Sequence, residues 1–147
     1  MSTSNTLALL LEHAERERDA ALAAHGEAQA ALARAQSQAD DLVQYRASYQ
    51  QRWIGEAQNG VGIETFQCVH SFAERLSQAL GQQGQLIQVL ESRWNATRDA
   101  LQQRELRVAS LKKLIERRQS EALQIAQRQD QKLNDEWAAR AHRSLTP

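Results

Sequence analysis

The sequence is short of the residues that build compact globular folds. Its 147 residues include one proline, one cysteine, six glycines and seven aromatic side chains. β-Branched residues are also sparse, which disfavours a sheet protein. With so little bulky apolar material, a solvent-shielded active-site core is not expected. No run of 18 apolar residues occurs, so we expect no transmembrane helix and no direct membrane insertion.

The cysteine count and the first residues bear on the compartment. Cys68 has no second cysteine with which to form an internal disulfide, which fits a reducing compartment. The first 21 residues contain one short apolar run, at positions 7–11, without a basic stretch before it or a cleavage site after it. A signal peptide is therefore not expected, and a cytoplasmic location is predicted.

The charges balance overall but not along the chain. Eighteen basic and eighteen acidic side chains give a net charge of zero. Residues 1–60 carry five basic and eight acidic groups, whereas residues 91–147 carry twelve basic and eight acidic groups. Neither segment has the dense basic stripe of a nucleic-acid binder, so no nucleic-acid partner is expected. The basic bias of the C-terminal part favours an acidic protein surface.

The residues that are present predict long helices. Ala, Gln, Leu, Arg, Glu and Lys together account for 92 of the 147 residues. The only strong break is at residues 55–62, where three glycines and an Asn-Gly pair fall within eight positions. We predict one all-α domain over residues 1–147, with a first helix at about 5–55, a reversal at about 55–62 and a second helix at about 63–143.

A heptad stripe runs along both predicted helices and indicates a left-handed coiled coil. The first stripe is rich in alanine and the second in larger residues, which favours an intramolecular antiparallel hairpin over a parallel homodimer. The first stripe comprises Leu7, Leu11, Ala14, Arg18, Ala21, His25, Ala28, Leu32, Ala35, Ala39, Leu42, Arg46, Tyr49 and Trp53. The second comprises Phe66, Val69, Ala73, Leu76, Leu80, Gln83, Ile87, Leu90, Trp94, Thr97, Leu101, Arg104, Val108, Leu111, Ile115, Arg118, Ala122 and Ile125.

The two helices have unequal lengths, so the second should overhang the first. With the reversal near Asn59, residues whose numbers add to about 118 should face each other, and Leu7 should meet Leu111. About 30 residues of the C-terminal helix then lack a partner. Because this overhang keeps an apolar stripe, we expect it to bind another protein. Its apolar residues are Leu114, Ile115, Ala122, Leu123, Ile125, Ala126, Leu133 and Trp137.

No set of residues indicates an enzyme or a bound cofactor. The four histidines and Cys68 lack metal-ligand spacing, so no metal is expected. Phosphate-binding and nucleophile motifs are absent, and a straight coiled coil offers no pocket. Four further residues interrupt the helical pattern. Gly81 and Gly84 are either surface glycines or a point where the hairpin can bend or a partner can approach closely. Arg104 and Arg118 either extend their charged ends to solvent or set the register of the two helices.

Three segments together resemble the flagellar FliJ family, the soluble coiled-coil component of the flagellar type III export apparatus. Residues 38–49 (QADDLVQYRASY) resemble its L-x-x-Y-x-x-x-Y ending of the first helix. Residues 72–79 (FAERLSQA) match the segment shortly after the reversal. Residues 128–141 (RQDQKLNDEWAARA) match the C-terminal pattern R-x-D-Q-K-x-x-D-E-aromatic-A-x-R-A, the most specific of the three.

The resemblance implies a non-enzymatic export component. FliJ-like proteins are antiparallel coiled coils, similar to the central stalk of rotary ATPases. They insert into the hexameric flagellar export ATPase and promote its assembly and activity. They also contact the cytoplasmic domain of the export gate, FlhA, and help to recycle export chaperones. A monomer at the cytoplasmic face of the inner membrane, at the flagellar base, is therefore expected.

The resemblance also places candidate contact residues. The gate-contact pattern falls on Gln38, Leu42, Tyr45, Tyr49, Phe72, Leu76, Ala79 and Gln83. Leu42, Tyr49, Leu76 and Gln83 are stripe positions as well, so hairpin packing is the alternative role for most of the set. Tyr45 and Phe72 lie off the stripe and are the candidates expected to be exposed. Gln83 stands where the family pattern can have histidine.

Five basic residues of the overhang are the candidates for contact with the ATPase, because a cationic, partly apolar helix suits an acidic ring interior. The alternative is that they are ordinary solvated charges on a helix surface. They are Arg117, Arg118, Arg128, Lys132 and Arg140.

Three other functions compete with the export stalk. They are the equivalent stalk of a virulence type III injectisome, a scaffolding coiled-coil homodimer, and an amphipathic helix on a membrane surface. The narrow stripe and mixed polar face disfavour the membrane helix.

Overall fold

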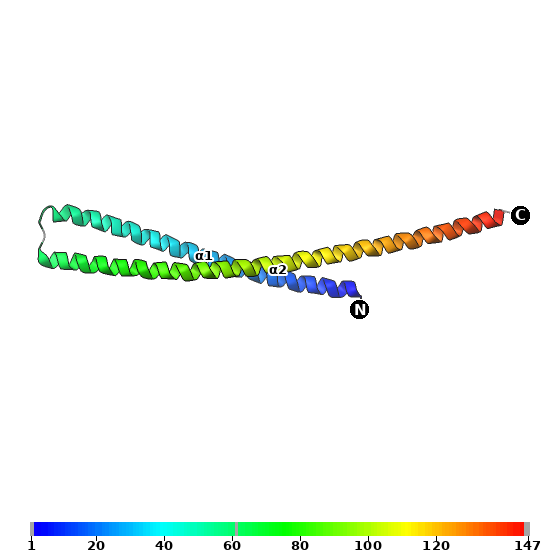
Figure 1. Cartoon of the computed structure of the whole chain (residues 1–147), viewed down its shortest axis with the longest axis horizontal. Helices are drawn as coiled ribbons and strands as arrows, with labels where there is room; N and C mark the ends of the chain where they lie inside the picture. The colour runs from blue at the N-terminus through cyan, green and yellow to red at the C-terminus, as the bar shows by residue number, and fades with distance from the viewer. Residues whose placement is uncertain (1, 61, 146–147) are drawn as a thin grey trace. The chain divides into compact units, whose positions relative to one another are not determined.

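The computed structural model describes residues 2–60 and 62–145, and within them the chain forms two α-helices. Helix α1 is Thr3–Ala57, with 55 residues, and α2 is Ile63–Leu145, with 83 residues. Figure 1 shows both, with no strand in the described residues. The predicted all-α helical hairpin is confirmed, and the predicted helix ends lie within two residues of the observed ones.

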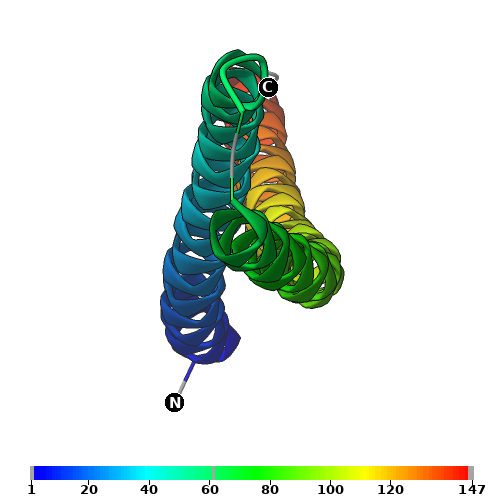
Figure 2. The same ribbon diagram turned by 90° about the vertical axis from the view of Figure 1, so that its left-hand side faces the viewer.

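The turn between the helices depends on one glycine. The amides of Asn59 and Gly60 donate to the carbonyl oxygens of Glu56 and Ala57, at 3.0 and 3.3 Å, and so end α1. Gly60 has φ of 83°, a left-handed conformation that favours glycine after a helix C-terminus. Figure 2, viewed from the turn, shows the ends of α1 and α2 at this connection.

The predicted stripe of α1 is its packed face. All fourteen positions are buried or partly buried, whereas most of the remaining α1 residues are exposed. The buried ones are Leu7, Ala14, Ala28 and Ala35, at 7% exposure or less. Three of these four are alanines, which lets the facing helix approach closely.

The stripe of α2 is packed along only part of its length. From Val69 to Ile115 every predicted position except Arg104 is buried or partly buried. Phe66 at the start is 56% exposed. Beyond Ile115 the predicted positions Arg118, Ala122 and Ile125 are exposed. The coiled-coil pattern therefore continues in the sequence past the point where the structure uses it.

The chain divides into two packing units. One is Asp19–Gln102, which includes the turn, and the other holds the described residues on either side of it. Within the first unit, Gln83 contacts Ala35 and His25 contacts Trp94, close to the pairing expected from a reversal near Asn59. The single domain over the whole chain stays a prediction.

In the second unit the pairing lies about one helical turn further along α2 than expected. Leu7 lines a hollow together with Ile115 and Ala122, although it was expected to meet Leu111. Leu114 and Ile115 are accordingly partly buried and do not belong to the overhang. Every residue from 116 to 145 is exposed, which agrees with the predicted overhang of about 30 residues. Arg118, Gln119 and Ala122 still border the hollow beside α1, and the segment beyond this hollow, residues 123–145, is here called the tail.

Candidate interaction surfaces

Aromatic side chains join the two helices within the unit Asp19–Gln102. The ring of Phe72 lies 4.6 Å from that of Tyr49 and 6.0 Å from that of Tyr45, measured between centroids. Phe72 is thereby partly buried, so the expectation that it is exposed is wrong. Although Phe72 lies next to the stripe, the large rings of Tyr45 and Tyr49 on α1 reach across and cover it. Tyr45 is 54% exposed, as expected.

The remaining gate candidates are mostly packed between the helices. Leu76 is 7% exposed, and Leu42 and Ala79 are partly buried. The side-chain amide of Gln83 donates to the carbonyl oxygen of Ala35 at 2.9 Å and to Oε1 of Gln38 at 3.2 Å. These contacts agree with the packing alternative for six of the eight residues, and leave Gln38 and Tyr45 as the exposed members.

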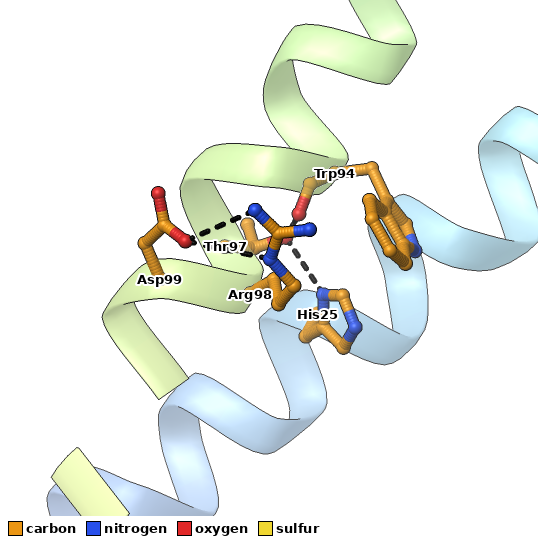
Figure 3. A network of polar contacts seen from close by, with 5 residues as sticks. All are labelled: His25, Trp94, Thr97, Arg98 and Asp99. Atoms are coloured by element: carbon orange, nitrogen blue, oxygen red, sulfur yellow. Dashed lines mark hydrogen bonds and ion pairs between the residues drawn. The ribbon is translucent and has the colours of Figure 1, made fainter. Parts of the chain in front are cut away.

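A polar network interrupts the apolar seam further along the same unit (Figure 3). The Thr97 hydroxyl donates to the carbonyl oxygen of Trp94 at 3.0 Å, so its oxygen accepts from Nδ1 of His25, also at 3.0 Å. The His25 ring lies 5.3 Å from the Trp94 ring, and the Arg98 guanidinium lies 5.2 Å from the same indole. Arg98 also pairs with Asp99 at 3.3 Å. All three of His25, Trp94 and Thr97 are predicted seam positions, so the pairing rule could have found this network.

In the other unit, an ion pair between Arg104 and Glu17 joins the helices. Arg104 Nη1 donates to Glu17 Oε2, while Glu17 Oε1 also lies 2.9 Å from Nε2 of His13. Of the two roles considered for Arg104, this pairing supports setting the register, because a shift of one helix along the other would separate the charges. Arg118 is exposed and makes no ion pair with a described residue.

The tail is exposed at every position. Figure 1 shows no other helix beside the orange and red end of α2. Its large apolar side chains are exposed by more than half: Leu123 by 61%, Ile125 by 54%, Leu133 by 53% and Trp137 by 68%. An exposed apolar surface of this kind is a candidate for contact with another protein.

All five ATPase candidates are exposed. Arg117 is 3.9 Å from Glu121, its neighbour one turn along. Arg117 and Arg128 are eleven residues apart and Lys132 follows four later, so the three share one side of the helix.

The positive charge of α2 is densest just before the tail. Residues 104–118 carry six basic and two acidic side chains, whereas the tail carries four basic and three acidic side chains. The excess positive charge therefore lies on the part of α2 that precedes the tail, where Lys112, Lys113 and Arg107 make no ion pair with a described residue.

Further features of the described residues bear on chemistry and membranes. They include no group of three or more histidine, cysteine, aspartate or glutamate side chains that could hold a metal. Cys68 is exposed. No helix among residues 2–60 and 62–145 is both long and apolar enough to cross a membrane. A side chain added at Gly81 or Gly84 would meet no atom of the described chain within 4 Å, so no part of this chain requires glycine there.

The described residues define a class of protein: an all-α helical hairpin with exposed apolar and charged surfaces. The family model of the flagellar FliJ protein matches residues 3–145. The chain belongs to this family and is a component of the flagellar export apparatus. No curated protein and no solved structure matches the chain.

Proposed function

We propose that this protein is the stalk of the flagellar export ATPase. The tail inserts into the hexameric ring, stimulates ATP hydrolysis and is held there by Arg128, Lys132 and Arg140, with Arg117 and Arg118 at its base. The same protein contacts the cytoplasmic domain of the export gate and escorts export chaperones, at the cytoplasmic face of the inner membrane.

The observation that carries this proposal is the exposed tail. Twenty-three residues of α2 extend past the N-terminal end of α1, and none of them is packed against the chain. An isolated helix is marginal in water, so such a segment is expected to gain order from a partner. The family motif of residues 128–141 lies wholly inside the tail, which supports the same assignment.

The test is ATP hydrolysis by the cognate export ATPase at a concentration where the ring is partly assembled. We expect the full chain to stimulate hydrolysis and a truncation that ends at Ala122 to fail, while the truncated hairpin keeps its melting temperature. Equal stimulation by both forms would place the contact on the hairpin and contradict the proposal.

The charged contacts need a separate variant. Replacing Arg128, Lys132 and Arg140 by glutamine should weaken ATPase binding at least tenfold, since each lost charge-assisted contact costs about 1.5–3 kcal/mol if it is shielded in the complex. The matched control replaces Arg34, Arg52 and Arg75 in the hairpin. If both triple variants bind the ATPase equally well, the three basic side chains of the tail do not contact it and are solvated charges on the helix surface.

Gate contact is proposed for the face that contains Gln38 and Tyr45. Tyr45 is exposed by 54%, and its ring packs edge-on against Phe72 at 6.0 Å between centroids, so most of its surface remains accessible to a partner. Tyr45→Ala should weaken binding to the gate domain, and Val43→Ala, at 45% exposure, is the control. A gate domain that binds both variants as it binds the unchanged chain would exclude this face.

A further inference from the structure

The turn end of the hairpin carries most of the aromatic side chains of the chain. Five of the seven lie between residues 45 and 72. Toward the turn the stripe of α1 changes from alanine to Tyr49 and Trp53, and Phe66, the stripe position of α2 nearest the turn, is 56% exposed. The Phe66 ring lies 6.1 Å from that of Trp53 and is parallel to that of His70 at 6.3 Å. The last part of the seam is therefore aromatic and incompletely covered.

Two hollows follow each other along this part of the seam. The first, of about 410 Å³, is lined by Trp53, Ala57, Ile63 and Phe66. The second, of about 190 Å³, is lined by the same Trp53 and Phe66 together with Tyr49, Gln50, Val69, His70 and Ala73. Because they share two residues and are displaced by about one helical turn, they form one groove, here called the turn groove. A cavity of about 150 Å³ accepts benzene, so each hollow has room for an aliphatic side chain.

We propose that the turn groove binds one amphipathic α-helix of a partner protein, which carries two aliphatic side chains one turn apart and a lysine or arginine beside them. The larger hollow is lined by apolar residues alone, which suits aliphatic side chains. Along most of the groove the backbone of α1 and α2 is already hydrogen-bonded within the helices, so an extended segment would find few backbone partners. A helix satisfies its own backbone groups and places residues i and i+4 about 6 Å apart, close to the spacing of the hollows.

The charges beside the groove favour a basic partner. Residues 52–69 carry one basic side chain, Arg52, and two acidic ones, Glu56 and Glu64, and none of the three makes an ion pair with a described residue. Glu64 lies in the first turn of α2, where a negative charge stabilises the helix. Glu56 lies in the last turn of α1, whose carbonyl end repels it, and that turn has no basic residue. A lysine or arginine of the partner would offset this repulsion.

The same charges argue against a membrane surface as the occupant. Ile54, Ile63 and Phe66 are exposed by 59%, 77% and 56%, and exposed apolar residues can also enter a lipid interface. Attraction to anionic lipid requires a basic surface, however, and the two acidic and one basic side chains of residues 52–69 give a net charge of −1. A protein helix with a basic side chain fits both the shape and the charge of the groove.

The turn groove goes beyond the proposed export stalk. It lies nearer to the turn than Gln38 and Tyr45, the exposed residues of the proposed gate face. Its test needs only the purified full-length chain and a synthetic peptide, without the ATPase or the gate domain. The groove can therefore bind or fail to bind its helix whatever the outcome for the stalk.

The probe is a fluorescent alanine-rich helical peptide of about 16 residues, with two leucines four positions apart and two lysines beside them. Fluorescence anisotropy should give a dissociation constant of roughly 100 µM for the full-length chain. Ile63→Ala should weaken binding at least about fivefold, because Ile63 lines the larger hollow and, at 77% exposure, contributes little to the fold. The matched control is Ile54→Ala, because Ile54 is 59% exposed on α1 but lines neither hollow, and this variant should bind as the unchanged chain does.

Exchange of charges tests the basic character of the partner. Replacing the lysines of the peptide by glutamates should weaken binding about threefold, and Glu56→Lys should reverse this preference. Vesicles with about one-third anionic lipid should bind the unchanged chain and Ile63→Ala equally. The proposal is overturned if the lysine peptide does not bind at concentrations up to about 2 mM, if Ile54→Ala loses as much affinity as Ile63→Ala, or if the two peptides bind equally. Vesicle binding that Ile63→Ala abolishes would overturn it in favour of a membrane surface.

Discussion

The hairpin unit Asp19–Gln102 and the tail are both helical and both carry a stripe of apolar side chains, yet they use it differently. In the hairpin unit the stripe is covered by the facing helix, with Leu76 at 7% exposure. In the tail, Leu133 is at 53% and Trp137 at 68%. The same pattern that stabilises the fold in one region remains exposed in the other. The hydrophobic pattern of a helix thus specifies a contact face but not the partner.

The largest expected difference between these regions concerns leucine truncation. Leu76→Ala should lower the free energy of unfolding by about 2–3 kcal/mol, because it removes a buried side chain and leaves a cavity. Leu133→Ala should change it by less than about 0.5 kcal/mol, as for other exposed positions. Urea unfolding followed by circular dichroism at low micromolar concentration measures both. Equal effects would mean that the tail is packed in solution.

Two glycines sharpen the comparison between turn and helix. Gly60→Ala should destabilise the hairpin by about 1 kcal/mol, because φ of 83° is strained for a side chain. Gly26→Ala should stabilise it by about 0.5–1 kcal/mol, since Gly26 lies inside α1 and an added Cβ meets nothing within 4 Å. Opposite shifts in melting temperature are expected. A shift in the same direction for both would contradict the positive φ of the turn.

Much of this organisation could be predicted from the sequence. The glycine cluster located the turn, and all fourteen positions of the heptad stripe predicted for α1 are buried or partly buried. The burial of Phe72 could not be predicted in this way, because it depends on two tyrosine rings reaching across from the other helix. The residue beside Leu7 was also missed. The pairing there is shifted by about one turn, from Leu111 to Ile115, and periodicity alone does not fix the register of two helices.

The pairing of His25 with Thr97 predicts a smaller effect inside the seam. Thr97→Val keeps the shape of the side chain but removes the oxygen that accepts from Nδ1 of His25, so we expect a loss of about 1 kcal/mol. Thr65→Val, at an exposed position of α2, is the control and should be neutral. Urea unfolding distinguishes them. A neutral Thr97→Val would show that water replaces the lost acceptor.

The smallest expected effect concerns the ion pair between Arg104 and Glu17. Both side chains are partly accessible, at 46% and 31%, so solvent and salt screen their attraction. A double-mutant cycle with Arg104→Ala and Glu17→Ala should give a coupling free energy of about 0.2–1 kcal/mol, which falls as salt is added. His13 is also within 2.9 Å of Glu17, so the cycle is repeated with His13→Ala to separate the two contacts. A coupling that does not respond to salt would point to packing of the arginine stem. A salt-dependent coupling would mean that electrostatics help to set the register that decides where α1 stops covering α2 and the tail begins.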